Sequence, residues 1–209
     1  MRTYNVKILT NPGIDWESIP TAPIDTYLWD SDYMPEAGAQ VVYVKSGDGR
    51  EGIYSHLWCR ESNPRAIYHK HNDPVFKDSC LEFFFTMNAA GAEKNGYINI
   101  ESNSDPTTLI GYGHDRYDRV SIVDMGIEPF RVTGTKTAER WDIYEFVPLS
   151  VLTKVFGLKE VDETVEFAGN FYKCGGDHMP LPYGMWSRVD TPTPDFHRPS
   201  CFGKFILER

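Results

Sequence analysis

Three segments of the chain, 81–86, 97–102 and 165–172, alternate apolar residues with polar or aromatic ones. Because successive side chains of a strand point to opposite faces, the apolar residues predict a core face and the others a second, mixed face. That second face carries Glu82, Phe84, Thr86, Tyr97, Asn99, Glu101, Glu166, Asn170 and Tyr172. Rings that stack on C–H groups, beside carboxylates and amides that bond hydroxyls, suit recognition of a sugar. A solvated sheet face shows the same alternation, so both interpretations stay open.

The mixed face also offers carboxylates for catalysis. Glycoside hydrolysis needs two of them about 5 to 10 Å apart, and Glu82 and Glu101 on neighbouring strands fit that separation. A glycoside hydrolase is therefore the first alternative to a binding protein. A second alternative is a haem- or redox-binding sandwich that uses ligands such as Met87 and His178.

Evidence for a metal site is incomplete. The segment 68–73 places His69 and His71 on one face of an extended chain, but a transition-metal site needs three or four ligands, which favours solvated loop histidines. The loop from Gly111 to Asp118 offers oxygens without the spacing of a known calcium loop. We expect no cofactor, with structural calcium as the remaining option.

Short alternating segments separated by Gly, Pro, Asn and Asp predict the strands that position these residues. The expected strands are 40–44, 52–60, 81–86, 97–102, 119–124, 141–147, 165–172 and 204–208. Aromatic residues, which favour strands, make up 14% of the chain. The pattern predicts an all-β fold, an antiparallel β-sandwich of the jelly-roll or immunoglobulin-like kind, with residues 1–209 as one domain.

Two segments differ from this strand pattern. Residues 148–157 begin with Pro, carry apolar residues at helical spacing and end at Gly, which predicts one short helix. Residues 1–39, with prolines at 12, 20, 23 and 35, predict extended chain wrapped around the sandwich, because proline cannot donate to a ladder.

Charge and composition exclude several classes of partner. The chain has 30 acidic and 21 basic residues, a net charge of -9 and no basic cluster to follow a phosphate backbone, so we expect no nucleic acid. No apolar run reaches the roughly 20 residues of a membrane span, so we expect a soluble protein and no membrane partner. The N-terminus lacks the apolar stretch of a secretion signal, which predicts a cytoplasmic protein, although an exported chain without its leader would look the same. Four widely spaced cysteines predict free, buried thiols.

Several stretches resemble carbohydrate-binding module family 9 and its stand-alone relatives. The resemblance is carried by residues 72–84 (NDPVFKDSCLEFF) and by WSRV at 186–189, followed by PDFHRPSCFG at 194–203. Residues 97–103, 141–148 and 170–174 fall between them in the family's order, so the similarity covers roughly residues 40 to 209.

This resemblance implies a sandwich that binds a mono- or oligosaccharide, or the end of a polysaccharide chain, without cutting it. Such a protein would serve polysaccharide breakdown, with a glycosidase as a partner. The implied clamp consists of Trp186 and Phe76, where better-known members have Trp at the second position; Phe keeps a π face but has less area and no N–H donor. Glu82 matches the family's hydroxyl-binding acid, and Asn99 falls near a basic binding position. The remaining candidates are Glu101, Asn170, Tyr172 and Lys173.

Two of the matched positions also have structural interpretations. Residues 183–186 fit a core strand, so Trp186 either contacts the ligand or is buried. His197-Arg198-Pro199 is predicted to be structural, because an arginine beside prolines in a loop commonly ties carbonyls or carboxylates together.

Overall fold

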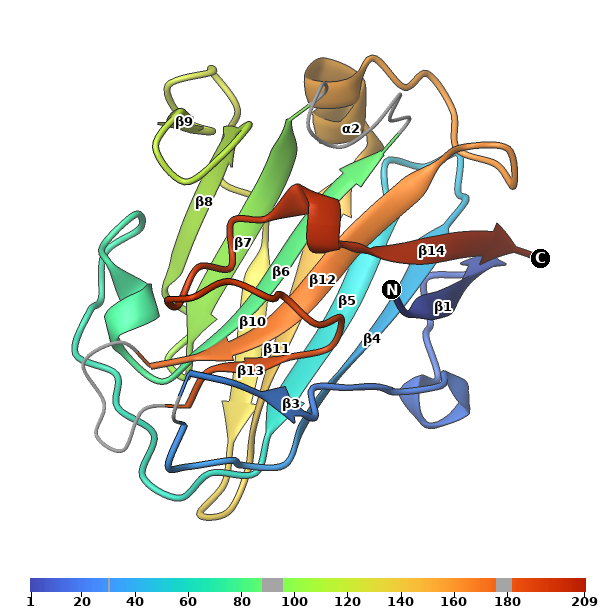
Figure 1. Ribbon diagram of the computed structural model, residues 1–209. Helices are drawn as coiled ribbons and strands as arrows, with labels where there is room; N and C mark the ends of the chain where they lie inside the picture. The colour runs from blue at the N-terminus through green and yellow to red at the C-terminus, as the bar shows by residue number, and fades with distance from the viewer. Residues whose placement is uncertain (30, 88–95, 176–181) are drawn as a thin grey trace.

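The computed structural model describes residues 1–29, 31–87, 96–175 and 182–209. Strands dominate this part of the chain (Figure 1). They are β1 (Thr3–Leu9), β2 (Ala22–Pro23), β3 (Thr26–Tyr27), β4 (Ala37–Val44), β5 (Gly52–Cys59), β6 (Cys80–Met87), β7 (Tyr97–Asn103), β8 (Thr108–Gly113), β9 (Arg119–Ser121), β10 (Val132–Lys136), β11 (Trp141–Pro148), β12 (Phe167–Cys174), β13 (Gly184–Met185) and β14 (Gly203–Glu208). The helical segments are α2 (Leu149–Phe156) and the 3-10 turns η1 (Trp16–Ser18), η2 (Val75–Lys77) and η3 (Pro199–Cys201).

The strands form one strongly curled sheet that makes both layers of the sandwich. Its order is β10-β11-β5-β4-β1-β14-β12-β6-β7-β8-β9, with β2, β3 and β13 off this path. Figure 1 shows β12, β6 and β7 in front of β11, β5 and β4, so the turn from one layer to the other falls at β1 and β14. The main core lies between the layers. It is built by residues such as Val41 and Leu57 from one layer and Phe83 and Ile100 from the other. The predicted all-β sandwich is confirmed.

Strand β1 corrects the prediction for the N-terminus. Residues 3–9 are not wrapping chain but a strand that pairs in parallel with both β14 and β4. These two parallel pairs are also exceptions to the predicted antiparallel sheet. The segment precedes the first proline, and its alternating Tyr4 and Val6 enter the core. After it, Ile19 covers Val42 and Val44 of β4, and β2 then pairs with β4 and places Ala22 in the main core.

The helix and most of the central strands lie where the sequence predicted them. Helix α2 begins after Pro148 and ends at Gly157, which has φ 74°, the left-handed conformation that glycine adopts at low cost. Predicted strand 119–124 is shorter than expected, because after Ser121 the chain turns through Asp124 N–H to Ser121 O and Met125 N–H to Ile122 O. Strands β8 and β10 were not predicted.

The mixed face of β6, β7 and β12 is largely covered. Phe84, Tyr97 and Tyr172 on this face form a second cluster with Phe196 and Phe202. The segment before β14, which contributes those last two rings, crosses in front of β12, β6 and β7 in Figure 1. The face therefore is neither fully solvated nor fully buried, and its open part forms the pocket described below.

The cysteines are free thiols; Cys59, Cys80 and Cys174 are buried and Cys201 is half-buried. Within the described ranges, no helix is both long and apolar enough to cross a membrane.

Candidate binding pocket

A pocket of about 560 Å³ opens on the outer face of β6, β7 and β8. Its floor comes from these strands. One wall comes from the segment that contains η2, a second from the chain at 116–121, and a third from residues 194–197. Segments far apart in the sequence therefore converge on one sheet face.

Two buried glutamates form the floor. Glu82 and Glu101 are directly opposite each other on β6 and β7, and their residues are 2% and 4% exposed. Burial first, and then the adjacent Glu101 carboxyl, raise the pKa of Glu82 well above its usual range. Burial also raises the pKa of Glu101 to about 7, although hydrogen bonding from Asn99 and the charge of Arg119 oppose the rise. Two carboxylates this close disfavour double ionisation, so a proton is retained on the pair near neutral pH.

One buried oxygen of the pair has no hydrogen-bond partner in the described part of the chain. Asn99 Nδ2 donates to Glu101 Oε1 at 2.7 Å. Glu101 Oε2 has no hydrogen-bond partner among the described residues, and neither glutamate forms an ion pair with them. A buried acceptor without a donor is unfavourable, and a ligand hydroxyl at this position would satisfy it.

A cation lies beside this floor. The guanidinium of Arg119 lies over the Tyr97 ring, 4.4 Å from its centroid, donates to Asp115 O at 3.2 Å and donates to Asn99 Oδ1. Gly111 leaves the space for this arrangement, since a Cβ there would lie 2.8 Å from Asn99 Oδ1. Arg119, Asn99 and Glu101 thus form a chain of hydrogen bonds in which Glu101 Oε1 is the oxygen that is engaged.

His197 completes the polar wall. Its Nδ1 shares a 2.7 Å hydrogen bond with the Tyr97 hydroxyl. Burial, followed by the charges of Arg119 and Arg116, lowers the pKa of His197 to about 3, so the imidazole is neutral in this setting. It presents a polar ring to a ligand without adding charge.

Aromatic rings border the floor. Phe76, on η2, is 36% exposed. Trp29 reaches the pocket from the N-terminal segment with φ 56°, uncommon for a non-glycine residue, and its Nε1 donates to Thr191 O at 2.7 Å. Trp29 packs on Tyr183 and Phe196 at centroid distances of 5.8 and 5.6 Å. Phe76 and Trp29 therefore supply stacking surfaces next to buried acids.

The predicted site residues divide into two groups. Phe76, Glu82, Asn99 and Glu101 line the pocket. Trp186, Asn170, Tyr172 and Lys173 do not line it.

The sugar clamp predicted for Trp186 is corrected by its burial. The residue is 3% exposed and packs in the core against Phe205, at a centroid distance of 5.4 Å and an interplanar angle of 21°, and against Phe171 and Tyr4. A hydrogen bond from Trp186 N–H to Phe171 O fixes this segment beside β12. The ring lies directly against Gly203, where any Cβ would collide with it. The core interpretation of this residue is therefore the one observed.

The three β12 candidates have structural partners instead of a place in the lining. Asn170 bonds Ser187 O through Nδ2 and Ser187 N–H through Oδ1, at 2.7 and 2.8 Å. The Tyr172 ring stacks on Phe196 at 4.2 Å, and its hydroxyl donates to Phe196 O. Lys173 points to the core, where its ammonium pairs with Glu61 at 3.5 Å, because it is opposite core-facing Leu81 rather than Glu82.

Sequence reasoning missed several pocket residues. Arg198 is structural as predicted and pairs with Asp195 at 2.8 Å, but the neighbouring His197 lines the pocket. Arg116 and Arg119 lie in or just after the loop considered for calcium, where Asp115 Oδ1 instead accepts from two backbone N–H groups. The other missed residues with polar or aromatic side chains include Trp29, Asn72, Lys77, Tyr183, Asp195 and Phe196.

The structure also shows the surroundings of the residues considered as metal or haem ligands. His71 Nδ1 lies 3.2 Å from Thr108 Oγ1, and no group of three His, Cys, Asp or Glu among the described residues is arranged to hold a metal. Met87 is fully buried in the main core, whereas His178 lies outside the described residues. Burial of Met87 removes it as an accessible haem ligand.

Solved structures share this fold. A protein from Bacteroides uniformis ATCC 8492, provisionally described as carbohydrate-binding, has a TM-score of 0.77 and 24% identity, covering 99% of both chains. A carbohydrate binding module family 9 structure from Caldicellulosiruptor kristjanssonii in complex with glucose has a TM-score of 0.62 and 12% identity, covering 99% of this chain and 96% of that chain. Another from this organism, in complex with cellotriose, has a TM-score of 0.65 and 12% identity, with coverages of 99% and 94%. No curated protein matches the sequence significantly.

The fold and pocket define a β-sandwich that offers a ligand a polar floor and aromatic walls on one outer sheet face. The sequence adds the family. The model of carbohydrate-binding family 9 matches residues 10–207, and the chain belongs to this family.

Proposed function

We propose that this protein binds a sugar in the pocket over β6, β7 and β8 and does not cleave it. The observation that carries the proposal is the floor of two buried glutamates, with Glu101 Oε2 unpaired, between aromatic walls in a member of carbohydrate-binding family 9. Glu82, Asn99 and Glu101 would bond hydroxyls, and Phe76 and Trp29 would stack on the C–H faces of the sugar ring.

The ligand we propose is glucose or a short β-glucan fragment. Family members from Caldicellulosiruptor kristjanssonii are solved in complex with glucose and with cellotriose. A pocket of about 560 Å³ suits one or two sugar units, which favours a mono- or oligosaccharide or a chain end. A ligand this small buries little area, so we expect dissociation constants from about 1 μM to 1 mM.

Hydrolysis by Glu82 and Glu101 is not supported by their placement. A glycosidase sets its acid and its base or nucleophile on either side of the scissile bond. These two residues lie side by side on the same sheet face, both beneath a ligand in the pocket. Any polysaccharide cleavage linked to this protein is therefore assigned, as part of the proposal, to a separate partner glycosidase.

Calorimetric titration of the protein with glucose, cellobiose and cellotriose, with reducing sugar measured in the same samples, tests the proposal. We expect saturable binding, no product, and binding lost in Glu82→Gln/Glu101→Gln. A matched Glu139→Gln variant, changed at an exposed turn, should bind like the wild type. Product formation by the wild type, or binding unaffected by the double change, would contradict the proposal.

A further inference from the structure

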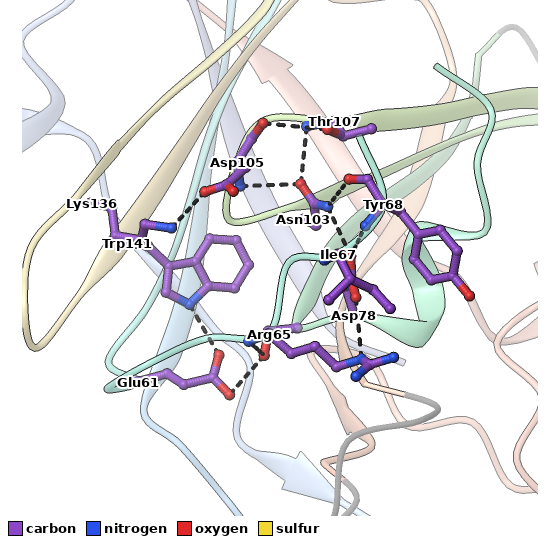
Figure 2. Close-up of polar contacts among 11 residues, drawn as sticks. Glu61, Arg65, Ile67, Tyr68, Asp78, Asn103, Asp105, Thr107, Lys136 and Trp141 are labelled. Carbon is purple, nitrogen blue, oxygen red and sulfur yellow. Dashed lines mark hydrogen bonds and ion pairs between the residues drawn. The ribbon is translucent and has the colours of Figure 1, made fainter. Parts of the chain in front are cut away.

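The segment 61–79 brings three residues to the pocket without the support of a strand. It joins β5 to β6 and carries Asn72, Phe76 and Lys77, and its regular structure is limited to the short η2 turn. Phe76 can offer a stacking face only if this segment is held in one conformation. The polar contacts around Asp78 and Asn103 that help to hold it are drawn in Figure 2.

Asp78 is the centre of these contacts. Its side chain is fully buried, and Oδ2 accepts from the N–H groups of Ile67 and Tyr68 at 3.0 and 3.1 Å and from Asn103 Nδ2 at 3.0 Å. Oδ1 pairs with Arg65 Nε at 3.3 Å. The carboxylate thus binds the early part of the segment to its last turn.

Asn103 links this arrangement to the pocket floor. Its Nδ2 also donates to Tyr68 O at 2.9 Å, and its Oδ1 accepts from the N–H groups of Asp105 and Thr107 at 3.1 and 3.0 Å. Asn103 is the last residue of β7, the strand that carries Asn99 and Glu101. Figure 2 shows its amide between Asp78 and the turn that contains Thr107. The segment is therefore held in register with the floor.

The base of the segment is closed independently. Glu61 accepts from Trp141 Nε1 and Ser79 Oγ, both at 3.1 Å, and Arg65 and Ser79 exchange hydrogen bonds of 2.9 and 3.0 Å. This closure fixes the two ends. Between them, Asn72 bonds β8 through its N–H to Thr108 O at 2.8 Å and through Oδ1, which accepts from Ile110 N–H at 3.2 Å, while Asp78 and Asn103 fix the stretch that carries Ile67 and Tyr68.

We propose that Asp78 and Asn103 are positioning residues for the pocket. Neither lines it. They act through Phe76, two residues before Asp78, whose carbonyl also accepts from the Cys174 thiol at 3.4 Å. The effect on affinity rests on the proposed sugar binding, whereas the effect on the segment's conformation does not.

The test compares Asp78→Asn with Asp105→Asn. Asp105 lies in the turn after Asn103, and its side chain pairs with Lys136 rather than with the segment 61–79. Hydrogen exchange of residues 62–79 and cellotriose affinity are measured on the intact proteins. In Asp78→Asn we expect faster exchange at Ile67 and Tyr68 and affinity weaker by about tenfold, the effect of about one well-placed hydrogen bond. Asp105→Asn should change neither.

A milder variant keeps the proposal testable if Asp78→Asn fails to fold. Arg65→Met removes only the ion pair to Asp78 and should weaken affinity by about threefold with faster exchange in the same peptide. A variant that lowers the melting temperature but leaves exchange and affinity at wild-type values would overturn the positioning role. Failure of the wild type to bind any sugar would contradict the proposed function instead. The hydrogen-exchange measurement would still decide whether Asp78 holds the segment in one conformation.

Discussion

Asp78 and the Glu82–Glu101 pair are buried acids on adjoining parts of the same face, yet their partners differ. Asp78 Oδ2 accepts from three N–H donors of its own segment and of the last residue of β7, and Oδ1, which forms no hydrogen bond within the described part of the chain, pairs with Arg65. The glutamates share a single amide donor and a weak contact with the Cys174 thiol, and Glu101 Oε2 is left without a partner among the described residues.

This difference separates a carboxylate that shapes the chain from carboxyls that are available to a ligand. A buried carboxylate that accepts three hydrogen bonds at one oxygen and pairs with an arginine at the other stabilises one conformation of the chain around it. A buried acid with an unpaired oxygen costs stability, and binding a hydroxyl there recovers part of that cost. The comparison predicts opposite responses to substitution in the two places.

The largest effect is expected at Asp78. Asp78→Ala leaves Arg65 and three N–H groups without their acceptor and should lower the free energy of unfolding by about 3–5 kcal/mol. Urea denaturation followed by fluorescence measures this. The matched Asp105→Ala change at an exposed ion pair should cost less than about 1 kcal/mol. Similar losses of unfolding free energy in the two variants would mean that the Asp78 network stabilises the fold no more than a surface ion pair does.

A second contrast concerns two aromatic residues that were predicted to act together. Trp186→Ala should lower the free energy of unfolding by about 3–5 kcal/mol, because it opens a cavity beside Phe205. Phe76→Ala, at a partly exposed ring, should change stability little and weaken sugar binding by about 1–3 kcal/mol. Differential scanning calorimetry and titration of both variants check the pair. If the Trp186→Ala protein had normal stability but bound sugar weakly, Trp186 would be a ligand-contacting residue rather than a core residue.

Trp186 and Glu82 show what the sequence could predict. Strand period alone placed Glu82 and Glu101 opposite the core, because side chains alternate strictly along β6 and β7, and these residues do line the pocket. Trp186 directly follows the two-residue strand β13, which is too short to show any period, and its direction is set by packing on Gly203 and Phe205. Trp29 and Arg119 were out of reach for the same reason: loop conformation and a distant Gly111, not local pattern, bring them to the site.

The third prediction uses pH to compare the pocket acids with a buried acid outside the pocket. Glu145 lies in the interior and accepts from Ser55 Oγ at 2.6 Å, and burial raises its pKa to about 8. Burial raises the pKa of Glu101 to about 7. Since both folded-state pKa values exceed the ordinary 4.5, these two groups bind more protons in the folded protein than in the unfolded chain, and their contribution to stability falls as pH rises from about 5 to 8. His197, whose pKa is lowered to about 3, acts in the opposite direction up to about pH 6.5 and offsets part of this fall.

We expect this loss to be on the order of 3 kcal/mol across that range. Urea denaturation at intervals of pH measures it, and Glu145→Gln should flatten the profile more than Glu101→Gln. Saturating sugar should reduce the dependence that remains in Glu145→Gln, since hydroxyl bonds to the pocket carboxylates favour their ionised form. Stability that rises over this interval would contradict the raised pKa values.

The smallest effect, and the sharpest test of the comparison, is Glu101→Gln. The amide keeps the size of the side chain and one carbonyl oxygen but removes a group whose charged form is disfavoured by burial, so stability should be unchanged or slightly higher. Sugar affinity should fall by about 1–3 kcal/mol, because a charge-assisted hydrogen bond to a ligand hydroxyl becomes a neutral one or is lost. Titration calorimetry and urea denaturation of the same preparation give both values. A fall in stability with unchanged affinity would place Glu101 in the same class as Asp78, as a carboxylate that shapes the chain, and would leave the unpaired oxygen at the pocket floor without a role in binding.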